Sequence, residues 1–149
     1  MSTSYSHILF ATDMLQETNA VAEKAKDLAD IFQADLSAIH VVESIPVYFG
    51  NELVLPETQE IERQLLDQAK KKMTELCQTL AIPEANGHVE VGVIKHEILD
   101  FAIHNDVDLI VLGSHSRRGL EHLLGSTARA VVNSANCDVL AVRVPATKK

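Results

Sequence analysis

Residues 107–115 read VDLIVLGSH and join a short, unbroken apolar run to a polar end that contains a glycine. The four apolar residues 109–112 leave no polar face, which is typical of a strand covered on both faces in a parallel sheet. Gly113 follows at the expected tip of this strand, where a residue without a Cβ lets a ligand approach the backbone closely. The stretch therefore predicts an α/β fold with polar chemistry at the carboxyl end of a strand.

Three more unbroken apolar runs predict similar strands, at Ile8–Ala11, Ala38–Val42 and Val139–Val142. The segment His88–Gly92 alternates instead, which favours an edge strand with one wetter face. Apolar residues recur at helical spacing between these strands, so strand and helix alternate as β-α-β-α-β-α-β-α-β. The stretch Glu43–Glu57 contains two prolines and a glycine and is expected to be a long loop, either functional or merely mobile.

The composition bounds the class of protein. The chain has 149 residues, which fits one domain over residues 1–149, and a formal net charge of -8 at pH 7. Such an acidic chain repels nucleic acid and anionic lipid, since phosphate binding needs a basic surface. Neither cysteine forms a CxxC pair, and we see no secretory signal and no apolar run of membrane length. A cytoplasmic protein is therefore expected.

Two segments carry suitable chemistry at expected strand ends. Asp13 closes the run Ala11-Thr12-Asp13, where its carboxylate can accept hydrogen bonds from ribose hydroxyls or help to hold a cation. It can equally be an N-cap or turn aspartate before the next helix. Further on, Gly125-Ser126-Thr127 opens the last helix, and N–H groups at a helix N-terminus attract phosphate. Plain capping by Ser126 explains the same residues, and both interpretations stay open.

The intervening loop adds further candidates without a known phosphate motif. Arg117 and Arg118 could supply charge, or form a solvated pair. His115 could contact phosphate, donate a proton or bind a metal with His122, although a loop histidine bonded to the backbone is the commoner case. The spacing from Gly113 to Gly125 is too long for the GxxxxGK[ST], GxGxxG or GxSxG patterns.

Several blocks together resemble the universal stress protein family, in its adenine-nucleotide-binding branch. They are the opening HILFATD at residues 7–13, the pair His40-Val41, VDLIVLGSH at 107–115, GSTA at 125–128, and CDVLAVR at 137–143. The resemblance implies a Rossmann-like, adenine nucleotide alpha hydrolase-like α/β fold, with a five-stranded parallel sheet of order 3-2-1-4-5 and helices on both faces. In that order the first and fourth strands are neighbours, which brings Asp13 beside Gly113.

The resemblance also implies a ligand, AMP or ATP, with Mg²⁺ as an accompanying ion. By motif position, three groups of residues would hold it. Ala11, Thr12 and Asp13 would lie by the adenosine with Val41 lining the adenine pocket; Gly113, His115 and Ser116 would wrap ribose and phosphate; Gly125, Ser126 and Thr127 would hold the phosphates.

The chain departs from the usual family pattern at two points. Ser116 replaces its second glycine, and the stretch Arg117–Leu124 is one residue short. A shorter phosphate loop favours AMP over ATP.

Family members typically form a dimer through the last strand, and an apolar edge such as Val139–Val142 invites pairing. Three functions are therefore weighed: a nucleotide-binding stress protein, a nucleotide-independent dimeric scaffold on the same fold, and a weak ATP hydrolase. No lysine lies between Gly113 and Thr127. A binding protein without catalytic residues is thus preferred to an enzyme.

Overall fold

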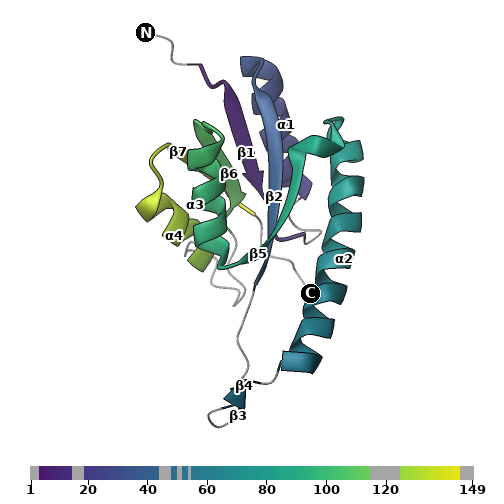
Figure 1. Cartoon of the computed structure of the whole chain (residues 1–149). Helices are drawn as coiled ribbons and strands as arrows, with labels where there is room; N and C mark the ends of the chain where they lie inside the picture. Colours follow the sequence, from purple (N-terminus) through teal and green to yellow (C-terminus); the bar gives the residue numbers. More distant parts are fainter. Residues whose placement is uncertain are drawn as a thin grey trace.

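A parallel five-stranded sheet forms the centre of the molecule in the computed structural model, which describes residues 4–14, 19–43, 48–49, 52–53, 55–114 and 125–144. Its strands are β1 (His7–Ala11), β2 (Asp35–Glu43), β5 (Gly87–Gly92), β6 (Leu109–Gly113) and β7 (Asp138–Val142). They lie in the order β5-β2-β1-β6-β7 (Figure 1), and every neighbouring pair is parallel. When only the five strands of this sheet are numbered along the chain, without β3 and β4, the order is 3-2-1-4-5. The predicted fold class is therefore confirmed.

Helices cover both faces of the sheet because successive strand residues point to opposite sides. Ile8 and Phe10 pack in one core cluster with α1 (Asn19–Phe32) and α2 (Leu55–Leu80). Leu9, between them in sequence, packs in a second cluster with α3 (Ile94–His104) and α4 (Ser126–Ser134). The unbroken apolar runs of β1 and β6 thus supply both cores at once, and three layers result.

The stretch expected to be a long loop, Glu43–Glu57, contains more regular structure than its sequence indicated. It holds the antiparallel pair β3 (Tyr48–Phe49) and β4 (Glu52–Leu53), and α2 already begins at Leu55. Pro56 does not prevent this start, because the first turn of a helix needs no N–H donor. The prediction of one loop over this stretch is therefore wrong at both ends. Glu43 is the last residue of β2, and α2 has already begun before Glu57.

The edge strands differ in how well the sequence described them. The alternating segment at 88–92 is the edge strand β5, which begins at Gly87 after a short 3-10 helix, η2 (Glu84–Asn86). By contrast, β7 was predicted from its unbroken run to be covered on both faces, and it is covered only in part. Val142 packs against the cluster under α1 and α2 and Val139 against the cluster under α3 and α4, but Leu140 is 36% exposed. Its position at the other edge of the sheet explains the difference.

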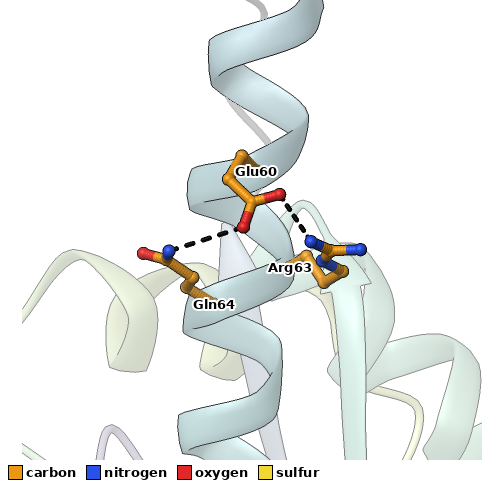
Figure 2. Close-up of polar contacts among 3 residues, drawn as sticks. All are labelled: Glu60, Arg63 and Gln64. Carbon is orange, nitrogen blue, oxygen red and sulfur yellow. Dashed lines mark hydrogen bonds and ion pairs between the residues drawn. The ribbon is translucent and has the colours of Figure 1, made fainter.

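Helix α2 extends beyond the carboxyl ends of the strands, and β3 and β4 lie past its first turn (Figure 1). Its C-terminal half is anchored by buried side chains such as Met73 and Cys77. On the exposed part, Arg63 donates a hydrogen bond to Glu60 at 2.6 Å and Gln64 donates one to it at 3.5 Å. Figure 2 shows these three side chains. No helix within the described residues is both long and apolar enough to cross a membrane.

Candidate functional site

The topological switch point of the sheet, where the strand order reverses, lies between the neighbouring strands β1 and β6. From β1 it proceeds outward to β2 and β5, and it then returns to the other side of β1 to form β6 and β7. The pairing of β1 with β6 ends at Phe10 and Val111. Residues Thr12 and Gly113 each lie two positions beyond that last pair, at the same carboxyl edge. In an open α/β sheet this is the place where ligands bind.

A tight turn at Thr12–Met14 ends β1, and hydrogen bonds hold it from several sides. The Thr12 N–H donates to the Ile39 carbonyl at 2.9 Å, and the Thr12 carbonyl lies 2.8 Å from His40 Nδ1. The Met14 N–H donates to Thr12 Oγ1 at 3.0 Å. Met14 has φ 65°, a left-handed conformation that costs a non-glycine residue about 1 kcal/mol. These hydrogen bonds therefore fix the backbone conformation on both sides of Asp13.

The turn settles one alternative for Asp13. Helix α1 begins at Asn19, six positions further on, so Asp13 is not its N-cap. Asp13 is instead the central residue of a turn at the carboxyl edge.

One face of this edge is apolar. Val41 is 6% exposed and packs in the core cluster that lies under α3 and α4, with Ala11 partly buried against that cluster. Ile94, the first residue of α3, packs against the same cluster. Ala11 and Val41 were predicted from the sequence to line this part of the site, whereas Ile94 was not. Its only signal was its position directly after β5, whose carboxyl end lies at the same edge.

Strand β6 and helix α4 meet directly, although Gly113 and Gly125 are twelve positions apart in sequence. The Ser114 N–H donates to the Val142 carbonyl at 2.9 Å, which fixes the tip of β6 against β7. The Gly125 N–H then donates to the Ser114 carbonyl at 3.2 Å. The start of α4 is therefore held at the tip of β6, as the predicted site requires.

Among the described residues, no side chain caps the start of α4. Its N-cap is Gly125, and Ser126 is the first helical residue, so capping by Ser126 is ruled out. The first intrahelical bond runs from the Arg129 N–H to the Gly125 carbonyl at 3.0 Å. Helix geometry leaves the N–H groups of the first turn without intrahelical partners. These donors, together with the helix dipole, make the end of α4 suitable for an anion.

The remaining site predictions lie outside the described residues. They are His115, Ser116, Arg117, Arg118 and His122. Within the described part of the chain, no three His, Cys, Asp or Glu side chains come together in a way that could bind a metal ion. The described half of the site is thus the Thr12–Met14 turn, the apolar wall and the start of α4.

These features define an open, doubly wound α/β protein with a polar edge at its switch point, and comparisons with known proteins agree. The model of the universal stress protein family matches residues 4–143, so the chain belongs to the universal stress protein family. Universal stress protein A homolog 1 of Coxiella burnetii is 40% identical over 138 residues, which cover 93% of this chain and 96% of the relative.

Solved structures show the same fold. Universal stress protein UspA from Lactobacillus plantarum has a TM-score of 0.81 at 29% identity, over 95% of this chain and 100% of that one. A universal stress protein in complex with cAMP has a TM-score of 0.63 at 18% identity, over 96% of this chain and 100% of that one.

Proposed function

We propose that this protein binds an adenine nucleotide, AMP or ATP, at the carboxyl ends of β1 and β6, and acts in stress response as a binding protein. The observation that carries the proposal is the hydrogen bond from the Gly125 N–H to the Ser114 carbonyl at 3.2 Å. It holds the start of α4, whose N-cap is a glycine, at the tip of β6, which is the neighbour of β1 in the sheet. Anion donors and the Asp13 turn therefore share one edge.

The parts of this edge match the parts of a nucleotide. The N–H groups of Ser126 and Thr127 suit phosphate oxygens, which need several donors and a positive dipole end. The carboxylate of Asp13 suits the vicinal hydroxyls of ribose, because an ionised carboxylate accepts hydrogen bonds from both. The apolar wall of Ala11, Val41 and Ile94 suits a flat purine. The complex of another universal stress protein with cAMP, a molecule of the same chemical class, supports this assignment.

Calorimetric titration of the full chain with AMP, ADP and ATP, with and without Mg²⁺, tests the proposal. We expect saturable binding that falls about 10- to 100-fold in Asp13→Asn, because hydrogen bonds to a charged group contribute about 1.5–3 kcal/mol. The matched control is Asp100→Asn on the exposed side of α3, which should bind as the wild type does.

Absence of binding to all three nucleotides would contradict the proposal and favour a nucleotide-independent scaffold. Release of phosphate from ATP above background, lost in Asp13→Asn, would instead favour a hydrolase.

We also propose that the protein works as a homodimer paired through β7, in the cytoplasm. Among the described residues β7 pairs only with β6, which leaves its other edge available for a second strand. Both cysteines are free thiols, and burial raises the pKa of Cys77 and of Cys137. Protonated thiols of this kind fit a reducing compartment, in which disulfides are rare.

A further inference from the structure

His40 lies directly behind the Thr12–Met14 turn, and the function proposed above gives it no role. Its ring is half-buried near the end of β2, and Nδ1 lies 2.8 Å from the Thr12 carbonyl oxygen. A carbonyl oxygen can only accept, so Nδ1 carries the proton and donates it in this contact. The bond therefore fixes both the orientation of the ring and the tautomer of its neutral form.

His40 approaches the turn from the face of the sheet opposite to the apolar wall. Along β2, Leu36 and Ala38 pack under α1 and α2, whereas Ile39 and Val41 pack under α3 and α4. Because side chains alternate along a strand, His40 belongs to the face of Leu36 and Ala38. A ligand lying against Val41 is therefore separated from the His40 ring by the sheet itself.

The His40 contact is nevertheless close to Asp13, the residue expected to bind ribose, because the Thr12 carbonyl carbon is bonded directly to the Asp13 nitrogen. The Thr12 carbonyl belongs to the peptide group that leads into Asp13, so a donor on that oxygen sets the orientation of this peptide. The same turn contains Met14 in its left-handed conformation, which relaxes readily unless neighbouring bonds prevent it. The Ile39 carbonyl and Thr12 Oγ1 constrain the two sides of the turn, and His40 constrains the peptide between them.

We infer that His40 is a positioning residue of the nucleotide site: it holds the Thr12–Asp13 peptide from behind, so that Asp13 is preorganised toward ribose. The inference rests on the proposed function. It assigns to His40 a contribution to affinity that depends on the ribose hydroxyls and on an N–H donor at the place of Nδ1. Preorganisation of this kind improves binding because the free protein has less conformational freedom to lose.

Three substitutions separate the donor from the shape of the side chain. His40→Asn puts an amide N–H close to the place of Nδ1, His40→Gln moves the amide about one bond further out, and His40→Leu keeps the bulk without a donor. His96→Leu, on the exposed surface of α3, is the matched control. Thermal unfolding identifies any variant that is not folded, and comparison of Asn with Gln still decides the question if His40→Leu fails to fold.

Each folded variant is titrated with AMP and with 2′,3′-dideoxy-AMP by calorimetry. We expect His40→Leu and His40→Gln to bind AMP about tenfold more weakly, while His40→Asn stays within about threefold of the wild type. For dideoxy-AMP, which lacks the hydroxyls that Asp13 would bind, all three variants should match the wild type. His96→Leu should bind both ligands normally.

The outcomes that would overturn the inference differ from those that concern the nucleotide site itself. If the wild type binds AMP and His40→Leu binds it equally well, His40 has no positioning role and the proposed function stands. Equal losses for AMP and dideoxy-AMP, or failure of Asn to restore binding, would show a general structural role instead. If the wild type binds neither AMP nor ATP, both the inference and the proposed function are wrong.

Discussion

Gly87, at the start of β5, is a residue whose lack of a side chain is needed for packing. A Cβ added there would lie 2.5 Å from Cys77 Sγ and 2.7 Å from Met73 Cγ, both on α2. We expect Gly87→Ala to lower the free energy of unfolding by about 1–3 kcal/mol, because extra volume in a packed core forces its neighbours to shift. Urea denaturation measures this loss.

The double variant Gly87→Ala, Cys77→Ala checks the cause. Removal of Sγ makes room for the new methyl group, so the loss in the double variant should be smaller than the sum of the two single losses. Additive losses would show that the clash with Cys77 is not the reason.

Asp108 joins the beginning of β1 to the beginning of β6. Its Oδ2 accepts a hydrogen bond from the Ser6 N–H at 2.8 Å, and its Oδ1 accepts one from the His7 N–H at 3.1 Å. We expect Asp108→Ala to reduce the free energy of unfolding by about 1–3 kcal/mol, because two backbone donors lose a charged acceptor. Asp108→Asn keeps one acceptor oxygen and should lose less. In urea denaturation, an effect no larger than that of Asp100→Ala on the exposed side of α3 would contradict this role.

The contact between β5 and α3 should make the free energy of unfolding depend on pH. The ring of His88 lies 4.6 Å from that of Phe101, and burial is the main cause that lowers the pKa of His88 below its ordinary value of 6.5. Nearby His7 lowers this pKa further, and Glu90 opposes the shift. The folded state thus binds a proton at His88 less readily than the unfolded chain does.

The sign of the effect follows from linkage. A group with a lowered pKa in the folded state is neutral in both states at high pH, so the folded protein loses stability as pH falls through about 6.5 toward the folded pKa. We expect His88→Phe, which keeps an aromatic contact with Phe101, to lose less stability than the wild type between about pH 7.5 and 5.5. Urea midpoints across this range measure the difference. His96→Phe is the exposed control, and an identical pH profile for His88→Phe and wild type would contradict the prediction.

Helices and strands were predictable from the sequence where burial determines the pattern of apolar residues. Strands β1 and β6 lie between two helical layers, so the runs Ile8–Ala11 and Leu109–Leu112 within them are uniformly apolar, whereas the sequence of the edge strand β5 alternates over residues 88–91. The pair β3 and β4 has two residues in each strand, too few to show any period. The first turns of α2 are polar because they extend beyond the sheet, so the apolar pattern began only at Ile61.

The candidate site was predictable only in parts. The residue types at Asp13, Gly113 and Gly125 indicated donors and acceptors, but about a hundred residues separate the first from the others. Their meeting depends on the strand order, which came from the family resemblance and not from periodicity. Ile94 and His40 could not be assigned from sequence, because each acts through a neighbour relation that only the folded sheet creates.

Within the described part of the chain, the outer edge of β7 has no partner strand, which predicts self-association of the protein. Leu140 lies at the middle of β7, is 36% exposed, and belongs to the apolar run Val139–Val142. In a two-fold dimer paired at this edge, both subunits contribute the same surface to the interface. One charge added at Leu140 would therefore appear twice in the interface. Like charges close together across paired strands are destabilising. Leu140→Lys should therefore weaken the dimer while leaving the monomer folded.

Size-exclusion chromatography with light scattering at micromolar concentration measures the effect. We expect about twice the monomer mass for the wild type and a shift toward the monomer mass of 16.3 kDa for Leu140→Lys. The control is Ile103→Lys, 58% exposed on α3, which contacts β2 and β5 on the far side of the sheet from β7. A wild type that is monomeric excludes the dimer, and a dimer that survives in Leu140→Lys but dissociates in Ile103→Lys places the interface on α3. Nucleotide affinity of the Leu140→Lys monomer then decides whether the site at β1 and β6 is complete within one chain. We expect it to be complete, because the Gly125–Ser114 hydrogen bond and the bonds that hold the Thr12 turn all lie within one chain.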